Sequence, residues 1–288
     1  MEIMRENVKI GVVLAGGMSK GAYEIGCLRA IREYFAPESI VAVTAASIGV
    51  PIGYAFVANK LDQVTQLWKD IKVEDTGRFF PNLSGNKDMH EAIRSLVGEN
   101  DPLLTEFYAT LWNLSDRKAE YVRISPLSDD ERREHLTAAI ALPVFGKGAK
   151  INGKTYFDGA YLDNIPVYPF LEMDVDYIFC IYFDKQDYQF ESEEFDAKCI
   201  KLYDFPIKHR WRDNYIVDPS SVDEFVQFGY DYTKRMIETV FEGKESHEEI
   251  REGIAQFRTQ APKKRSTSDT ILTNVNRLTS RLMKKNIR

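Results

Sequence analysis

The sequence of 288 residues predicts an α/β fold, because strand patterns alternate with helix patterns from its N-terminus onward. Residues 8–14 (VKIGVVL) and 40–46 (IVAVTAA) are rich in β-branched and small apolar residues, which is typical of strands buried on both faces. Each run leads through a short turn into a helix pattern, and strands joined by helices in this way form βαβ units. Since 44% of the residues are hydrophobic, the chain can bury a sizeable core.

The first helix is expected over residues 22–34, where apolar residues recur at helical spacing and a following proline prevents continuation: Ile25, Leu28, Ile31 and Pro37. The strand at 40–46 runs directly into Ser47, and a second helix begins after it. Gly49 and then Pro51 stand in its first turn, where proline is well accommodated.

The later elements follow from the same periodicities. A capping box formed by Ser128 and Glu131 predicts a helix that extends through residue 141. Further predictions are a helix at 61–71, strands at 121–124, 154–157, 176–183 and 198–203, and helices from residue 221 onward. Residues 76–116 contain the aromatic pieces 79–80 and 103–112, which suit either the wall or lid of a site for an apolar chain, or ordinary core packing.

Composition and charge exclude several classes of protein. The net charge of −6 argues against a general nucleic-acid binder, which needs a basic surface to neutralise phosphates. No secretory signal pattern is visible, and no run reaches the roughly 20 apolar residues of a membrane span. We therefore expect a cytoplasmic protein, or one peripheral at the membrane. Three cysteines without metal-ligand spacing predict neither a disulfide framework nor a metal site, and Cys27 and Cys180 are expected to be buried thiols.

The C-terminal residues 263–288 differ from the rest of the chain in charge. Eight basic residues and one acidic residue give this segment +7, which leaves −13 on residues 1–262. Four apolar residues fall on one helical face at spacings of four, three and four: Ile271, Val275, Leu278 and Leu282. We expect residues 1–262 to form the catalytic domain and residues 263–288 a basic amphipathic tail. Three interpretations suit this tail: a contact with an anionic membrane surface, a solvated extension, or a contact between subunits of an oligomer. The oligomeric state stays open.

Three motifs carry residues capable of chemistry. The first is Ala45-Ala46-Ser47-Ile48-Gly49, at a strand-to-helix junction. A sharp turn there lifts a serine hydroxyl clear of the sheet, near a helix N-terminus that favours negative charge, and it requires small neighbours such as Gly49. A serine that simply caps the following helix is the alternative.

The second motif is the glycine-rich loop Gly16-Gly17-Met18-Ser19-Lys20-Gly21. Its spacing fits neither the phosphate loop of nucleotide-binding proteins nor the dinucleotide fingerprint, because Lys20 precedes Gly21 and Met18 stands at a required glycine. Backbone N–H groups in such a loop suit an oxyanion hole, and a plain tight turn is the alternative.

The third motif is Asp158-Gly159-Ala160, at the end of a short strand. A carboxylate in such a turn can reach a reacting group, although an Asx-turn aspartate is common in this context. Asp163 follows closely and looks like a residue that starts a helix. The four histidines have no triad-like context, and His135 and His247 are expected to be solvated. A serine hydrolase of this sequence therefore needs another base, and an aspartate would serve.

Together the three motifs resemble the patatin-like phospholipase family, in the order GGMSKGAYEIGCL, AASIG and DGAYLDNIPV. The resemblance extends over residues 8–184 and more loosely over 225–240. It implies a three-layer α/β/α fold with a mostly parallel central sheet and a helical C-terminal region. It also implies a Ser47–Asp158 dyad without histidine, metal or cofactor.

The same resemblance implies roles for the loop residues. The backbone N–H groups of Gly16, Gly17 and Met18 would form the oxyanion hole, although Met18 replaces the family's third glycine. Lys20 would fix the loop or attract a phosphate head group. Gly21, Gly49 and Gly159 would support the turns, and Ala45 replaces the first glycine of the serine motif.

These residues predict a lipid acyl hydrolase of the phospholipase A or lysophospholipase type, with an acyl-serine intermediate and a phospholipid or other lipid ester as substrate. Two alternatives stay open. One is a soluble ester or thioester hydrolase without a membrane step. The other is a catalytically idle lipid-binding or regulatory protein that keeps the scaffold.

Overall fold

The computed structural model describes residues 8–17, 20–70, 87–143, 148–184, 186–203, 221–257 and 263–264. Within them the chain forms a mixed eight-stranded sheet in the order β5-β6-β3-β2-β1-β7-β9, with β4 paired to β3. The strands are β1 (Ile10–Leu14), β2 (Ile40–Ala46), β3 (Glu106–Asn113), β4 (Lys118–Arg123), β5 (Ala149–Ile151), β6 (Lys154–Asp158), β7 (Tyr177–Ile181) and β9 (Cys199–Leu202). The five strands β3, β2, β1, β7 and β9 run parallel. The antiparallel strand β4 pairs with the outer edge of β3, and β6, followed by β5, pairs antiparallel with the inner edge past the end of β2.

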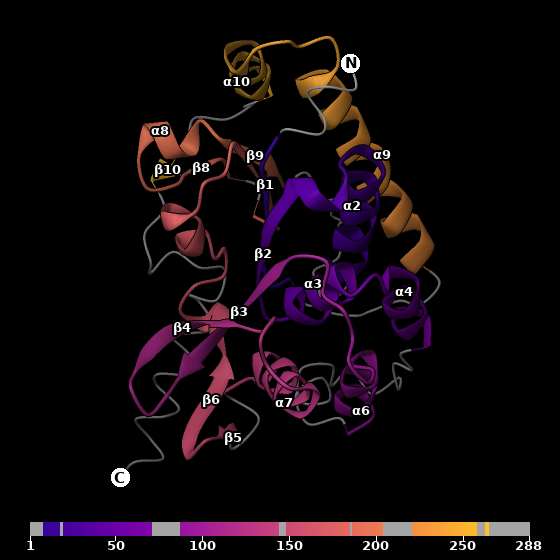
Figure 1. Cartoon of the computed structure of the whole chain (residues 1–288), viewed down its shortest axis with the longest axis vertical. Helices are drawn as coiled ribbons and strands as arrows, with labels where there is room; N and C mark the ends of the chain where they lie inside the picture. The colour runs from indigo at the N-terminus through magenta and orange to yellow at the C-terminus, as the bar shows by residue number, and fades with distance from the viewer. Residues whose placement is uncertain are drawn as a thin grey trace.

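The helices cover mainly one face of the sheet, as Figure 1 shows. They are α2 (Gly21–Tyr34), α3 (Gly49–Val57), α4 (Leu61–Asp70), α6 (Lys87–Leu96), α7 (Asp129–Ala139), α9 (Val222–Phe241) and α10 (His247–Gln256). The other face is covered by shorter elements: the 3₁₀ helices η3 (Gly159–Tyr161) and η4 (Tyr168–Glu172) and the short helix α8 (Glu193–Asp196). A third 3₁₀ helix, η2 (Pro37–Ser39), precedes β2. The predicted α/β fold with a mostly parallel sheet and C-terminal helices is confirmed.

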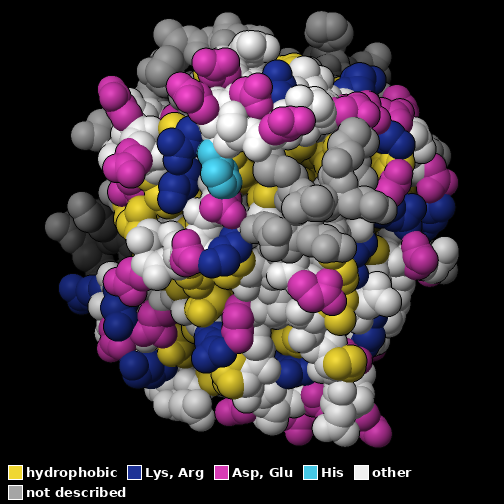
Figure 2. All heavy atoms as spheres, turned by 45° about the horizontal axis from the view of Figure 1, so that its top comes forward, with side chains coloured by type: hydrophobic (Ala, Val, Ile, Leu, Met, Phe, Trp, Pro, Cys, Tyr) yellow, Lys and Arg dark blue, Asp and Glu magenta, His cyan; other side chains and the backbone are white. Residues whose placement is uncertain are grey.

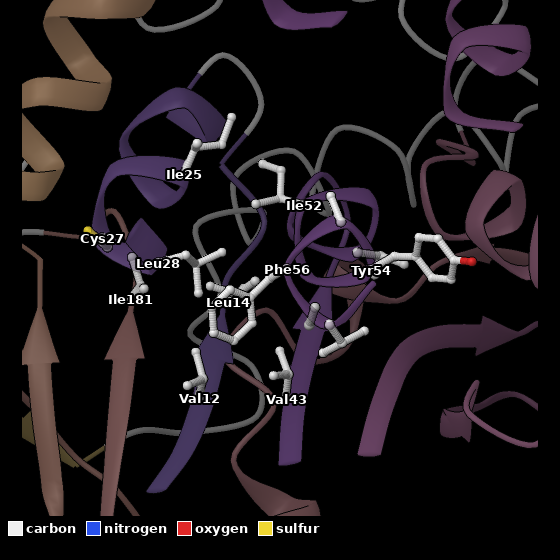
Figure 3. Close-up of a cluster of buried hydrophobic side chains, with 14 of the residues drawn as sticks. Val12, Leu14, Ile25, Cys27, Leu28, Val43, Ile52, Tyr54, Phe56 and Ile181 are labelled. Atoms are coloured by element: carbon white, nitrogen blue, oxygen red, sulfur yellow. The ribbon is translucent and has the colours of Figure 1, made fainter. Parts of the chain in front are cut away.

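The alternation of side chains along each strand divides the core into two clusters. In β1, Val12 and Leu14 face the helices α2 and α3, while Val13 faces the opposite cluster with Phe170 of η4. Figure 3 shows the helix-covered cluster, in which strand residues meet side chains such as Leu28 from α2. Strands buried on both faces therefore read as continuous apolar runs, which is why β1 and β2 were recognisable in the sequence.

Helices α2 and α9 pack closely because glycines stand at their contact. A Cβ atom on Gly26 would lie 2.0 Å from the carbonyl oxygen of Val226, and one on Gly229 would lie 2.2 Å from that of Tyr23. Only glycine leaves room for backbones at this separation. This contact fixes α2, whose N-terminus follows the glycine-rich loop.

Several local predictions are confirmed and others are corrected. The capping box of Ser128 and Glu131 begins α7, and all three cysteines are buried and free. The unassigned aromatic piece at 103–112 forms most of β3, so it is a central strand and not a lid; Phe107 is fully buried. Residues 79–80 lie outside the described part of the chain.

A group of buried charged side chains lies beside β9, next to the core cluster that contains Phe170. The Nζ atom of Lys201 lies 2.5 Å from Asp187 Oδ1 and 2.9 Å from Asp196 Oδ1, and all three side chains are at most 3% exposed. The neighbouring strand β8 (Tyr188–Gln189) pairs in parallel with β10 (Lys263–Lys264). The first two residues of the predicted basic tail thus pair with a strand from within residues 1–262. Residues 271–282, predicted to be an amphipathic helix, lie outside the described residues.

Among the described helices, none is long and apolar enough to cross a membrane. The face in Figure 2 carries acidic and basic side chains interspersed with small apolar areas.

Candidate active site

Ser47 occupies a strained turn between β2 and α3. Its φ of 53° is the left-handed conformation that side chains other than glycine seldom adopt, and its carbonyl accepts a hydrogen bond of 2.9 Å from the N–H of Val50. Gly49 is pressed against the end of β1, where a Cβ would lie 3.0 Å from the carbonyl oxygen of Leu14. The N-cap residue of α3 is Ile48, which makes no side-chain capping hydrogen bond, and the hydroxyl of Ser47 interacts with the carboxyl of Asp158.

The strand register brings Asp158 to the same edge of the sheet. Ala46 pairs with Thr110 on β3, and the next residue of β3, Leu111, pairs with Asp158 on β6. Because β4 pairs with residues 108–113 along the other edge of β3, β2 and β6 lie end to end along a single edge. Ser47 follows Ala46, so it comes next to Asp158 where β2 ends and β6 ends.

Gly159 allows the chain to turn tightly over β3 immediately after Asp158. A Cβ atom there would lie 2.3 Å from the carbonyl oxygen of Thr110, which any other residue would have to displace. The turn leaves Oδ1 of Asp158 accepting a 2.9 Å hydrogen bond from the N–H of Ala160. Oδ1 thus closes an Asx turn, while Oδ2 is buried and makes no hydrogen bond of standard geometry.

The surroundings of Asp158 bring the pKa of its carboxyl close to neutral pH. The side chain is 1% exposed, and this burial raises the pKa of its carboxyl to about 7. The hydroxyl of Ser47 and the N–H of Ala160 act in the opposite direction by stabilising the charged form. An ordinary aspartate would be a weak proton acceptor, so burial removes the main chemical objection to this residue as a base.

The first part of the glycine-rich loop lies directly beside Ser47. A Cβ on Gly16 would lie 2.7 Å from the Cβ of Ser47, and the Gly16 carbonyl accepts a 3.1 Å hydrogen bond from Nδ2 of buried Asn164. Gly17 lies against the ring of Phe183, 2.1 Å from where its Cβ would be. The structure thus brings Gly16, Ser47 and the segment after Asp158 together. Met18 lies outside the described residues.

Lys20 and Gly21 fix the other end of this loop to α2. The N–H of Lys20 donates to the carbonyl of Gly17 at 3.2 Å, and its Nζ lies 5.3 Å from the centroid of the Phe183 ring. Burial lowers the pKa of Lys20, and the charge of Asp184 opposes this shift. Gly21 lies against Trp68 of α4, so a side chain at this position would push α2 away from α4.

Sequence reasoning did not single out two residues of this region. Asn164 holds the carbonyl of Gly16, and its only sequence signal is a place six residues after Asp158. Glu24, one turn after Lys20, is fully buried without a hydrogen-bond partner for either oxygen, and burial raises its pKa well above the usual range. No sequence pattern distinguishes such a residue from an exposed one on a helix.

Two predictions about neighbouring polar residues are wrong. Asp163 does not start a helix: it is buried and accepts a 2.7 Å hydrogen bond from the hydroxyl of Tyr121. His135 is not solvated but 7% exposed, with Nδ1 2.7 Å from the carbonyl oxygen of Glu131. His247 is exposed and contacts Tyr177 at 2.7 Å. Within the described ranges, no three side chains of the metal-ligating types come together as a metal site would require.

Comparison with known proteins identifies the family of this chain. The family model described as patatin-like phospholipase matches residues 12–171, more than half of the chain, and spans all three motifs. The chain belongs to the patatin-like phospholipase family.

Curated relatives of this patatin-like chain are distant. An uncharacterized NTE family protein of Mycobacterium bovis is 24% identical over 176 residues, which cover 58% of this chain and 47% of the relative. Lysophospholipase nte1 of Emericella nidulans is 27% identical over 185 residues, which cover 60% of this chain and 12% of the relative. This chain therefore matches about half, or less, of the length of these relatives. Among solved structures it is similar to VipD from Legionella pneumophila, with a TM-score of 0.47 and 14% identity over 79% of this chain and 66% of that one.

Proposed function

We propose that the protein hydrolyses carboxylic esters of phospholipids or other lipids through an acyl-serine intermediate on Ser47, with Asp158 as the base. The observation that carries this proposal is the buried carboxylate of Asp158, whose pKa is about 7, placed beside a serine in a strained strand-to-helix turn. Strain and raised pKa values of this kind cluster at functional sites.

The first half of the proposed reaction transfers the acyl group to the enzyme. Ser47 Oγ attacks the ester carbonyl while Asp158 takes its proton, and the carbonyl electrons move to the oxygen. Backbone N–H groups of Gly16, Gly17 and Met18 are the proposed donors to this oxyanion, and the N-terminus of α3 adds a favourable dipole. The C–O bond to the alcohol then breaks, and Asp158 returns the proton to the leaving alkoxide.

The second half restores the enzyme. Asp158 takes a proton from a water molecule, which attacks the acyl-serine, and the tetrahedral intermediate uses the same N–H donors. Collapse releases the fatty acid, and the proton held by Asp158 returns to Ser47. The roles of base and acid therefore alternate on one carboxyl group, which a pKa near 7 permits at neutral pH.

The lipid nature of the substrate is supported by membership in the patatin-like phospholipase family and by the lysophospholipase among the relatives. Within the chain, Lys20 near the loop is the proposed contact for a phosphate head group. The basic residues from Lys263 to Arg288 are a proposed peripheral contact with anionic membranes, where each Lys or Arg contributes about 1 kcal/mol.

Labelling with a fluorophosphonate probe tests the nucleophile and the base. Wild type should gain one adduct by intact mass spectrometry, Ser47→Ala none, and Asp158→Asn should react at least 100-fold more slowly, since general-base catalysis contributes about 10²–10⁴-fold. Equal labelling of all three proteins would rule out the dyad, and no labelling of folded wild type would favour the idle alternative.

Product analysis tests the substrate class. Incubated with a mixed lipid extract, wild type should release free fatty acids that Ser47→Ala does not release. Turnover of micellar phospholipid should also exceed turnover of a short-chain soluble ester. The reverse preference would support the soluble ester or thioester hydrolase instead.

A further inference from the structure

The antiparallel portion of the sheet extends beyond the edge at which Ser47 lies. The pairing of β2 with β3 ends at Ala46 and Thr110, but β3 continues through Asn113 and returns as β4. The turns after β3 (residues 114–117) and between β5 and β6 (residues 152–153) therefore stand on the same side of the molecule as the serine turn. This hairpin rim adjoins Asp158, which pairs with Leu111.

Two pairs of aromatic residues lie on one face of this rim. Phe107 and Leu111 of β3 face the helix-covered core, so Trp112 points to the opposite face. There Trp112 stacks on Tyr161, with ring centroids 4.8 Å apart and planes 3° from parallel. Tyr121 of β4 and Tyr168 of η4 form the second pair, with centroids 6.2 Å apart. All four are partly exposed.

Two exposed leucines extend this aromatic face at its ends. Leu114, in the turn after β3, is 38% exposed, and Leu171, in η4, is 47% exposed. Residues three apart in a 3₁₀ helix lie on the same side, so Leu171 stands beside Tyr168. We call these six residues the aromatic rim: Trp112, Leu114, Tyr121, Tyr161, Tyr168 and Leu171.

At the turns, the charges beside the aromatic rim differ in sign from the protein as a whole, whereas Glu172 and Glu191 adjoin its Leu171 end. Residues 114–120 and 149–155, which form the two turns and their flanks, carry four basic and two acidic side chains. Arg117 and Lys150 are exposed, Lys118 is 60% exposed, and Lys154 is 46% exposed. A chain with a net charge of −6 thus presents a locally positive, aromatic-rich edge beside its candidate active site.

We propose that the aromatic rim is the surface by which this protein lies on an anionic lipid bilayer, with the Ser47 edge of the sheet turned toward the lipid. Tyrosine and tryptophan have an apolar body and a polar end, which suits them to the boundary between headgroups and acyl chains. The basic side chains at the turns complement anionic headgroups. Strand β10, where the basic C-terminal segment begins, pairs with β8 on the same face of the sheet as the rim.

The orientation deepens the proposed function, because it supplies the lipid substrate from the bilayer on which the rim rests. Bilayer binding itself requires no catalysis, so it can be measured on the full chain with Ser47→Ala. Esterase activity of the wild type on a short soluble ester is measured separately. Failure of one result therefore does not decide the other.

The experiment measures partitioning of full-length Ser47→Ala onto vesicles of phosphatidylcholine with 30% phosphatidylserine by co-sedimentation. Adding Leu114→Gln and Leu171→Gln should lower the partition coefficient at least tenfold, and adding Arg117→Glu and Lys150→Glu should lower it by a similar factor. Leu104→Gln is the matched control, because Leu104 is 43% exposed and precedes β3 at its other end. This control should leave partitioning within twofold.

A second measurement reports the position of the rim. Brominated lipids should quench the fluorescence of Trp112, and Trp112→Phe should remove most of the quenching. Unchanged partitioning in both double variants, equal losses with Leu104→Gln, or unquenched Trp112 would each overturn the proposal. A raised KM for the soluble ester in Leu114→Gln/Leu171→Gln, with unchanged vesicle binding, would also overturn it, because the rim would then belong to the acyl site.

Discussion

Lowering the pH from 8 to 6 should slow acylation of Ser47 about tenfold if Asp158 takes its proton. Burial raises the pKa of Asp158 to about 7, and only the ionised carboxylate can accept a proton. A group with this pKa is roughly nine-tenths ionised at pH 8, about half at pH 7 and about one-tenth at pH 6. An exposed aspartate with a pKa of about 3.9 stays ionised over this range and gives no such loss.

The rate constant for phosphonylation of Ser47 by a fluorophosphonate probe is the appropriate measure, because it does not depend on the physical state of a lipid substrate. It should be followed from pH 5.5 to 8.5 by intact mass, with circular dichroism confirming the fold at each pH. Asp163→Asn is the matched control, since Asp163 is buried nearby and accepts a hydrogen bond from Tyr121. This variant should keep the midpoint near 7.

A rate constant that stays constant from pH 8 to 5.5 would refute the assignment of Asp158 as a base of raised pKa. So would a midpoint that survives in Asp158→Asn, because another group would then be titrating.

Four further variants test the environment of the site and the core. Asp158→Asn should stabilise the protein at pH 8 by up to about 4 kcal/mol, because wild-type stability present below pH about 4 is lost as the pH rises through 7. Gly159→Ala should cost more than about 3 kcal/mol, since its Cβ would overlap a β3 carbonyl. Asn164→Ala should cost about 1–3 kcal/mol and slow Ser47 labelling at least tenfold, because the Gly16 carbonyl loses its buried donor. Lys201→Met should cost about 3–5 kcal/mol, since it leaves two buried carboxylates without their cation.

Urea unfolding measures the change in the free energy of unfolding for each variant. Matched variants of the same residue type at less crowded or more exposed positions show whether the surroundings of the residue cause the change. Gly153→Ala should cost only about 1–2 kcal/mol, because Gly153 has a positive φ but open space where a Cβ would be. Lys154→Met should cost less than about 1 kcal/mol, since Lys154 is 46% exposed. A gain in Asp158→Asn that persists at pH 4 would contradict its electrostatic origin. Equal costs at the two glycines, or at the two lysines, would contradict the packing arguments.

The sequence alone predicted the parallel strands β1, β2, β7 and β9 and the helices that follow β1 and β2, because apolar runs and helical spacing are local properties. The sequence did not predict β3 at the centre of the sheet. Successive side chains of β3 face two partly different environments on the two sides of the sheet, and its aromatic residues also suited a wall, a lid or the core. Tyr108 and Trp112 face one side while Phe107 and Leu111 face the other. Only pairing with β2 and β6 shows that this segment is a strand.

For the candidate site, the sequence by itself identified the reactive residue types and their order: a glycine-rich loop, Ser47 in a strand-to-helix turn, and Asp158 before a glycine. Tertiary structure decided whether these groups can act together. The register of β2 and β6 along one edge of β3 places Asp158 beside Ser47, burial raises the pKa of Asp158 to about 7, and Asn164 fixes the loop from a different segment. These properties depend on neighbours far apart in the chain and on the exclusion of water, and neither is encoded in any one stretch of sequence.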